Sequence, residues 1–143
     1  MPDEKLDLTA LKKAAEAFQK SLSISLKIES KDPQDLYEYE FENARSALIQ
    51  HFEITYELCW KTMKRYIEMD MGAAADIFNR KDLFRMAGER GLIDDFNAWM
   101  DFNRARNRTS HIYNEDIANE VYETAKQFIN ALKKFTAVME NRE

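Results

Sequence analysis

Residues 41–67 read FENARSALIQHFEITYELCWKTMKRYI, and neither glycine nor proline occurs between positions 34 and 71. Apolar residues recur there every three or four positions, which is the period of one face of an α-helix. They form two adjoining stripes, the first of Phe41, Ala44, Leu48, Phe52, Cys59, Met63 and Tyr66 and the second of Ile49, Tyr56, Trp60 and Ile67. The pattern predicts one long helix over about residues 36–69. Because each apolar stripe needs a surface to cover it, the helix is expected to have two packing partners.

Helical patterns also occur on both sides of this segment. Residues 8–29 carry a stripe with Thr9 as the expected N-cap, and Gly72 is expected to end the long helix. A short helix fits residues 81–89, and a fourth helix begins near residue 92 and runs toward Asn107. Asn114 is the expected cap of a last helix with a regular apolar stripe. The stripes of the first and last helices are Leu11, Ala15, Phe18, Leu22 and Leu26, and Ile117, Val121, Ala125, Phe128, Leu132, Phe135 and Met139.

These helices predict an all-α fold, an up-and-down antiparallel four-helix bundle with one short extra helix. With 143 residues, of which 45% are hydrophobic, the chain fits one domain over residues 1–143, with a core over about residues 8–139. Three glycines, two prolines and 33% charged residues agree with long helices.

Cysteine usage and hydropathy predict the compartment. The single cysteine, Cys59, excludes an intrachain disulfide and a zinc site built on several cysteines, which suits a reducing cytosol. No apolar run approaches the ~20 residues that a membrane span requires, and the first residues show no signal-peptide pattern. We therefore expect a soluble cytoplasmic protein without a membrane partner.

The net charge of -5 argues against a protein that coats nucleic acid by broad phosphate neutralisation. Basic residues nevertheless gather in two places. One group is Lys61, Lys64 and Arg65, and the other is Arg104, Arg106 and Arg108. Charge alone leaves open whether these groups form local binding sites or ordinary solvated helix faces.

Residues 106–113 read RNRTSHIY and fall at the expected junction of the last two long helices. The imidazole of His111 can transfer a proton near neutral pH, and the guanidinium of Arg106 can hold a phosphate. Arg45 and His51 show a similar spacing, but six residues within one helix place them about 240° apart around its axis. The junction distinguishes Arg106 and His111 from that pair. A structural interpretation stays open, with Arg106 in a salt bridge, His111 near a helix N-terminus and Tyr113 packed on the bundle.

Motifs for metals and nucleotides are absent from the sequence. A carboxylate metal centre in a helix bundle would require inward-facing Glu-x-x-His pairs, and the chain has none. It also lacks a P-loop, a glycine-rich dinucleotide turn and a GxSxG elbow. We therefore expect neither a metal nor a cofactor.

Residues 45–66, RSALIQHFEITYELCWKTMKRY, resemble the signature of the nucleotidyltransferase substrate-binding proteins. These belong to the HEPN superfamily, which includes the HepT toxins. Further matches are GLIDD at residues 91–95, Trp99, and RNRTSHIYN at residues 106–114. The resemblance covers about residues 8–137, and the signature in the long helix is its most specific part.

The resemblance implies a HEPN-like homodimer that forms a complex with a small MNT-type nucleotidyltransferase. A second copy of the chain would then cover the second stripe of the long helix. Arg106 and His111 would be a metal-independent ribonuclease pair acting on RNA, supported by the polar Asn107. Tyr113 resembles the tyrosine to which the nucleotidyltransferase, as antitoxin, transfers AMP. Candidate RNA or nucleotide contacts are Lys61, Lys64, Arg104 and Arg108.

Two other functions remain compatible with the same residues. The chain could be a non-catalytic subunit that holds a substrate for the nucleotidyltransferase. It could also be a helical dimerisation module whose basic residues are solvated surface. The three functions differ in what they expect of Arg106, His111 and Tyr113.

Overall fold

The computed structural model describes residues 6–72, 77 and 79–142, and every regular element in these ranges is helical. The elements in order are α1 (Thr9–Glu29), the 3-10 turn η1 (Pro33–Asp35), α2 (Glu40–Met71), α3 (Arg80–Glu89), α4 (Phe96–Arg108), the 3-10 turn η3 (Thr109–His111) and α5 (Glu115–Asn141). The all-α prediction is confirmed. The long helix begins about four residues later than predicted, because residues 36–39 form an extended segment and a turn in which Tyr39 is left-handed.

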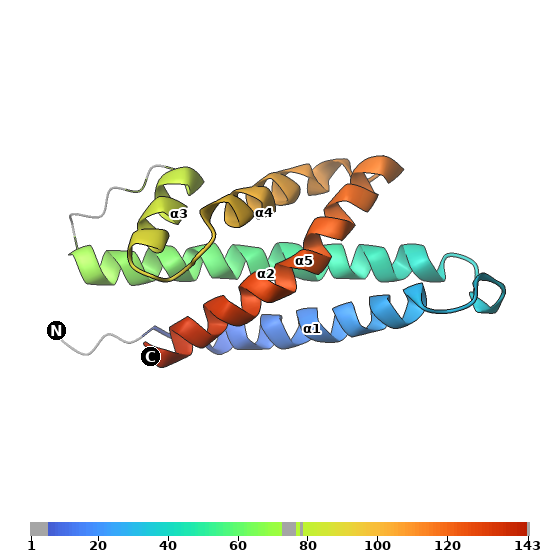
Figure 1. Ribbon diagram of the computed structural model, residues 1–143, viewed down its shortest axis with the longest axis horizontal. Coiled ribbons are helices and arrows are strands. Elements are labelled where there is room, and N and C mark those ends of the chain that lie inside the picture. Colours follow the sequence, from blue (N-terminus) through green and yellow to red (C-terminus); the bar gives the residue numbers. More distant parts are fainter. Residues whose placement is uncertain (1–5, 73–76, 78, 143) are drawn as a thin grey trace.

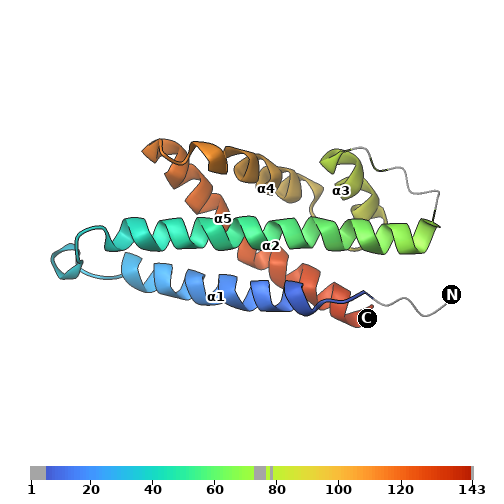
Figure 2. The same cartoon turned by 180° about the vertical axis from the view of Figure 1, so that it is seen from behind.

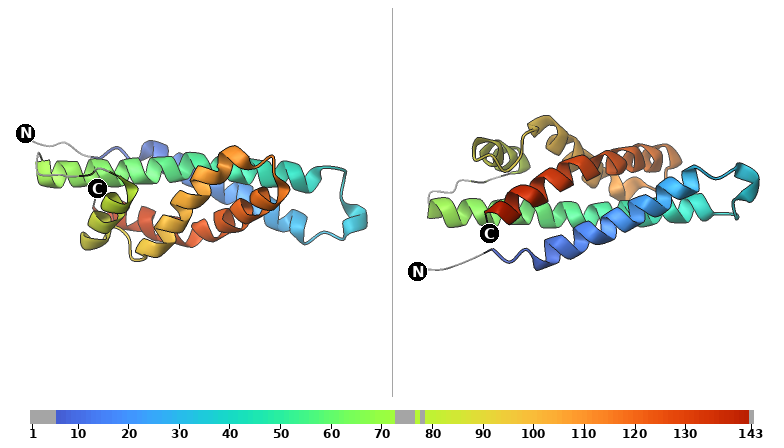
Figure 3. Two further views of the ribbon diagram at one scale, coloured as in Figure 1. Left: turned by 90° about the horizontal axis from the view of Figure 1, so that it is seen from above. Right: turned by 60° about the horizontal axis from the view of Figure 1, so that its bottom comes forward.

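The four long helices form two antiparallel pairs (Figure 1). α1 and α2 lie side by side, and α4 and α5 lie on one side of this pair, with α5 crossing it at an angle (Figure 3). The short α3 packs against α2 and α4. Successive long helices alternate in direction, so the up-and-down bundle with one extra helix is confirmed. No described helix is long and apolar enough to cross a membrane.

The caps of α1 and α5 test the predicted helix starts. Asn114 caps α5 as predicted, because its side chain accepts a hydrogen bond from the backbone N–H of Ile117. The prediction for Thr9 was wrong, since α1 already begins at Thr9. Oδ1 of Asp7 instead accepts a hydrogen bond from the backbone N–H of Thr9 at 3.0 Å. The Asp7 carboxylate therefore satisfies the first free N–H of α1 from outside the helix, and the N-cap Leu8 makes no side-chain bond.

Trp99 of α4 is the centre of the aromatic core. Its indole is buried and contacts rings from α2, α3 and α5 as well as its own helix, namely Tyr56, Phe84, Phe102, Phe128 and Phe135. These contacts fix the rotation of α4 about its axis. Arg106 lies seven residues after Trp99 and so faces nearly the same direction, toward α2. The core thus determines where the Arg106 guanidinium points.

Both apolar stripes of α2 are covered within the single chain. α1 packs on one side of α2, and α3, α4 and α5 pack on the other. Ile49, Tyr56 and Ile67 of the second stripe are fully buried, and Trp60 is partly buried. The expectation that this stripe requires a second copy was therefore wrong. The same chain supplies both partners.

One residue of the predicted α1 stripe does not enter the core. Leu26 is 49% exposed, whereas Ser25 and Ile28 on either side of it are buried. Ser25 is accommodated because its hydroxyl donates to the backbone carbonyl of Ala44 in α2 at 3.4 Å. Hydrophobic spacing could not show that a serine would face inward here.

Candidate functional site

Arg106 lies in the last turn of α4 and reaches two carboxylates of α2. Its Nη1 is 3.5 Å from Oε2 of Glu53, and its Nε is 3.2 Å from Oε1 of Glu57. The buried Nε–H has no hydrogen-bond partner among the described residues, so its contact with Glu57 is an ion pair without hydrogen-bond alignment. Glu53 and Glu57 are one helical turn apart, which places both on the α2 face that meets α4. The side chain of Arg106 stays about one-third exposed.

Thr109, the first residue of η3, holds Arg106 from the other side. The Thr109 hydroxyl donates to the backbone carbonyl of Arg106 at 2.8 Å. The same oxygen accepts a hydrogen bond from Nη1 of Arg106 at 3.1 Å. Since Thr109 is buried, this exchange couples the guanidinium to the turn in which α4 ends.

His111 and Tyr113 lie in the turn between α4 and α5, and both side chains are exposed. Tyr113 is the more open, at 85%. Its hydroxyl lies 3.5 Å from Nδ1 of His111, and the two rings meet edge to face with centroids 6.0 Å apart. The backbone N–H of Asn114 donates to the His111 carbonyl at 3.0 Å, which closes the turn. In the described ranges no hydrogen bond or ion pair joins Arg106 to His111.

A pocket of about 480 Å³ opens beside Arg106 between α2, α3 and α4. Asn107 lines it, together with Arg80 and Lys81 from the start of α3. The Arg80 guanidinium lies over the Trp60 ring, 3.1 Å from its centroid. The pocket therefore brings Arg106 together with two cations from a distant part of the sequence.

Tyr56 and Asn103 form a polar part of the pocket wall. The Tyr56 hydroxyl donates to Oδ1 of Asn103 at 2.8 Å. Burial raises the pKa of Tyr56 well above its usual range, and the nearby Arg80 only partly offsets this. Tyr56 is thus a neutral hydrogen-bond donor at working pH, and its bond fixes the orientation of the Asn103 carboxamide.

The other predicted basic contacts divide between two regions. Lys61 lies near the pocket, with Nζ 5.6 Å from the centroid of the Trp60 ring. Lys64 is partly exposed one turn further along α2. Arg104 and Arg108 instead line a groove of about 600 Å³ between α4 and α5. The structure therefore does not bring the four basic residues into one patch with Arg106.

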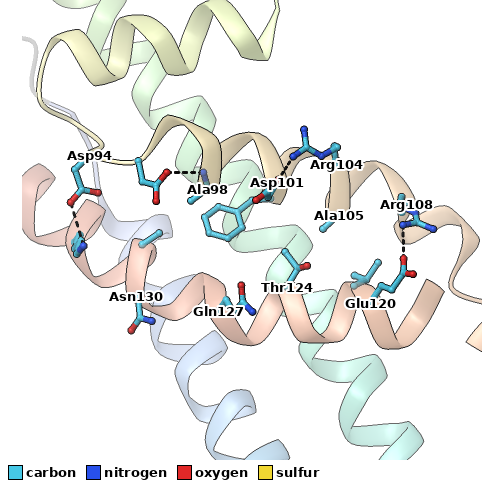
Figure 4. Close-up of a pocket in the computed structure, with 15 residues that line it drawn as sticks. Asp94, Ala98, Asp101, Arg104, Ala105, Arg108, Glu120, Thr124, Gln127 and Asn130 are labelled. Carbon is cyan, nitrogen blue, oxygen red and sulfur yellow. Dashed lines mark hydrogen bonds and ion pairs between the residues drawn. The ribbon is translucent and has the colours of Figure 1, made fainter. Parts of the chain in front are cut away.

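The groove between α4 and α5 is rich in acids (Figure 4). Arg104 is paired with Asp101, and Arg108 is paired with Glu120. Asp94 and Asp95 also line the groove. Because both arginines already have carboxylate partners and further acids lie nearby, the groove is a poor place to receive a phosphate backbone.

The pair of Arg45 and His51 is separated as its helical spacing predicted. Arg45 is buried, and its Nη1 donates to Oδ1 of Asn119 in α5 at 2.7 Å. His51 lines a small hollow with Ile24 of α1. The two side chains face different helices, and Arg45 has a structural role. Among the described residues, no group of three or more histidines, cysteines and acids could hold a metal ion.

Comparison with known proteins identifies the family. The model of the family described as "Nucleotidyltransferase substrate binding protein like" matches residues 6–141. The chain belongs to this family.

Two matches come from Haemophilus influenzae. One is named "Probable ribonuclease HepT" and is 40% identical over 83 residues, which are 57% of each chain. The other is a solved structure described as the fold of a substrate binding domain of a nucleotidyltransferase. That structure is 28% identical, with a TM-score of 0.83, and the match covers 94% of this chain and 99% of the other. A Thermus thermophilus structure, 22% identical with a TM-score of 0.62, shares the fold and matches over 85% and 98% of the two chains.

Several residues that surround Arg106 in this family member lie outside the motif at residues 106–113. Glu53 and Glu57 could have been found as a carboxylate pair four residues apart on α2. Arg80 and Lys81 could not, because a sequence does not show which helix end will lie against α4. The structure also separates the predicted pair, with Arg106 facing α2 and His111 facing solvent beside Tyr113.

Proposed function

We propose that this protein is a HepT-like toxin subunit of a toxin–antitoxin pair and acts as a metal-independent endoribonuclease. The turn after Arg106 carries the proposal, because it exposes His111 and Tyr113 together, with the phenol 3.5 Å from the imidazole. Family membership and the 40% identical relative named a probable ribonuclease support it. Arg106 and His111 are the proposed catalytic residues, and Asn107 supports them.

In the proposed reaction the RNA supplies its own nucleophile. His111 removes the proton of a ribose 2′-hydroxyl, and that oxygen attacks the adjacent phosphorus. The P–O5′ bond breaks, leaving a 2′,3′-cyclic phosphate and a 5′-hydroxyl that takes up a proton. Arg106 stabilises the negative charge that grows on the phosphate oxygens. For this step the guanidinium must exchange part of its contact with Glu53 and Glu57 for the phosphate.

Tyr113 is the proposed switch. A cognate small MNT-type nucleotidyltransferase would join the Tyr113 oxygen to the α-phosphorus of ATP and release pyrophosphate. The AMP group would then sit next to His111, because the Tyr113 hydroxyl already lies against that ring. Its negative charge would repel RNA and its bulk would cover the imidazole.

RNA cleavage in the presence of a chelator tests the enzyme. We expect the purified protein to cut RNA with EDTA present, and His111→Ala and Arg106→Ala each to lower the rate at least about a hundredfold, as loss of an acid–base group or a charge-stabilising donor does. His51→Ala is the matched control, since it removes the other histidine. Equal RNA survival with the wild type and His111→Ala would refute the ribonuclease.

Intact mass after co-expression with the cognate nucleotidyltransferase tests the switch. We expect the wild type to gain AMP and Tyr113→Phe to stay unmodified. Tyr37→Phe is the control, because Tyr37 is almost equally exposed. Modification of Tyr113→Phe would move the acceptor elsewhere.

A non-catalytic substrate-binding subunit is the second candidate function. It is favoured by the two carboxylates that pair with Arg106 and by the likeness to the 28% identical structure, which is described as a substrate binding domain. For such a subunit we expect no RNA cleavage. We also expect less modification by the partner nucleotidyltransferase when Arg106, His111 or Tyr113 is changed. A helical dimerisation module would be indifferent to alanine at Arg106, His111 and Tyr113 in both assays.

A further inference from the structure

The pocket beside Arg106 presents hydrogen-bond donors whose matching acceptors are already occupied. Oδ1 of Asn79 accepts from the backbone N–H of Asp82 at 2.8 Å. Oδ1 of Asn103 accepts from the Tyr56 hydroxyl at 2.8 Å. Both oxygens are therefore engaged, and each carboxamide has its NH₂ group left to donate. A ligand entering this pocket meets mainly donors.

The charge of the pocket also favours a ligand that carries hydrogen-bond acceptors. Three cations, Arg80, Lys81 and Arg106, line it with the carboxylate of Glu57, and Glu53 also pairs with Arg106, so the excess positive charge comes from Arg80 and Lys81. This local excess of positive charge occurs on a protein with a net charge of -5. Glu57 is engaged as well, since it accepts a hydrogen bond from Nε1 of Trp60 at 3.0 Å. The pocket is thus complementary to an anion that offers several acceptor oxygens.

The Arg80 guanidinium is held in place before any ligand arrives. It lies over the Trp60 ring, 3.1 Å from the centroid, and this stacking restricts the flexible side chain. A planar guanidinium fixed in this way can form two parallel hydrogen bonds to a phosphate with little further loss of freedom. The pocket volume of about 480 Å³ lies within the range of small-ligand sites.

We propose that this pocket binds the phosphate of a nucleotide, with Arg80, Lys81 and the Asn103 carboxamide as its donors, next to Arg106. The role in RNA recognition rests on the proposed function: the pocket would seat a nucleotide that neighbours the one being cut. A phosphate within an RNA strand and the phosphate of a free nucleotide offer the same oxygens. In the groove between α4 and α5, by contrast, Arg104 and Arg108 are paired with Asp101 and Glu120.

Binding to two probes tests the proposal. One probe is AMP, and the other is a 2′-O-methyl oligoribonucleotide, which cannot be cut because its 2′ oxygen carries a methyl group. Titration calorimetry gives affinities for the wild type, Lys81→Ala and Asn103→Asp. The aspartate keeps an oxygen for the Tyr56 hydroxyl and replaces the NH₂ donor with negative charge. Arg85→Ala is the matched control, because Arg85 is an exposed cation on the same helix outside the pocket.

We expect Lys81→Ala and Asn103→Asp each to weaken binding about tenfold, and Arg85→Ala to bind like the wild type. The salt dependence of strand binding should fall by about one unit of slope in Lys81→Ala. AMP binding with these effects identifies a free nucleotide as sufficient, whereas binding of the strand alone identifies an RNA phosphate. Equal affinities for all four proteins, or binding of neither probe to the wild type, would contradict the proposal that this pocket binds a nucleotide phosphate.

The pocket and the ribonuclease can fail independently. His111 does not line the pocket, so His111→Ala should bind both probes like the wild type while losing cleavage. Probe binding without any cleavage would leave the pocket intact and refute the enzyme. Equally fast cleavage by Lys81→Ala and the wild type at limiting RNA would contradict the role of the pocket in RNA recognition. It would leave the ribonuclease activity supported. Circular dichroism of each variant confirms that the helices remain folded.

Discussion

Arg106 combines a charge suited to phosphate with a setting that opposes phosphate binding. Glu53 and Glu57 both contact its guanidinium, so the three side chains together carry a net negative charge. Such a pair of carboxylates holds the arginine in one orientation. It also means that an RNA phosphate must compete with two resident anions. The acids therefore set both the geometry and the affinity of the proposed site.

Removing the charge of Glu53 should strengthen RNA binding. Glu53→Gln keeps the shape of the side chain and leaves Glu57, with its Trp60 hydrogen bond, in place. Because a partly exposed ion pair contributes up to about 1 kcal/mol, we expect about fivefold tighter binding of a 2′-O-methyl oligoribonucleotide. Fluorescence anisotropy at fixed salt measures this.

Glu68→Gln is the control for that variant, since Glu68 is an exposed acid on the same helix. It should change the affinity much less than Glu53→Gln, because the lost charge is not paired with Arg106. If both glutamine variants bind RNA equally tightly, or Glu53→Gln binds no better than the wild type, Arg106 does not contact the RNA phosphate.

At the scale of the helix, hydrophobic spacing predicted the elements well and their partners poorly. The uninterrupted segment before Gly72 gave α2, and the Asn114 cap gave the start of α5. The second stripe of α2 was interpreted as a surface for another chain, yet its own chain buries it. A period of 3.6 residues tells which side of a helix is apolar. It does not tell which helix will cover that side.

The candidate site shows the same division. Spacing separated Arg106 and His111 from Arg45 and His51, because only the first pair spans a helix junction. Nothing local indicated that Arg80, 26 positions before Arg106, would share a pocket with it. Contacts between distant helices depend on the packing of Trp99 and its neighbours, and a single sequence does not encode that packing in any short pattern.

Tyr122 joins the start of α5 to the end of α1 and should make stability depend on pH at the alkaline end. Its hydroxyl donates to Glu29, which also accepts from Nζ of Lys126 at 3.0 Å. Burial, together with the hydrogen bond to Glu29, raises the pKa of Tyr122 from 10.0 to about 12. The folded state thus favours the neutral phenol. The stabilisation is complete below pH 10 and is lost as pH rises from 10 to about 12.

Tyr122→Phe should remove this contribution. We expect the free energy of unfolding at pH 8 to fall by about 1 kcal/mol, the typical value of a hydrogen bond. The difference between wild type and variant should shrink between pH 10 and 12. Urea unfolding at several pH values measures it, and Tyr37→Phe, at an exposed site, is the control. A difference that stays constant to pH 12 would contradict the assignment.

At the scale of the whole molecule, no helix of the described ranges covers one face of the bundle. α4 and α5 lie on one side of the α1–α2 pair, and the view from behind shows α1 and α2 in front of the other helices (Figure 2). Ile24 and Ile54 are 56% and 47% exposed, and Ile24 lines a hollow between α1 and α2 with His51. Ile54 is three residues after His51 and therefore adjoins that hollow.

We expect the homodimer implied by the family resemblance to bury this face in its interface. We expect light scattering at micromolar concentration to give twice the 16.9 kDa mass of one chain. The double variant Ile24→Glu and Ile54→Glu should shift the mass to that of a monomer. Burying two unpaired carboxylates in each copy opposes association by several kcal/mol, which weakens the dimer at least about a hundredfold. Tyr37→Glu, which adds a charge at an exposed hydrophobic residue away from this face, should stay dimeric. A monomeric wild type would refute the dimer, and a dimeric double variant would place its interface on another face.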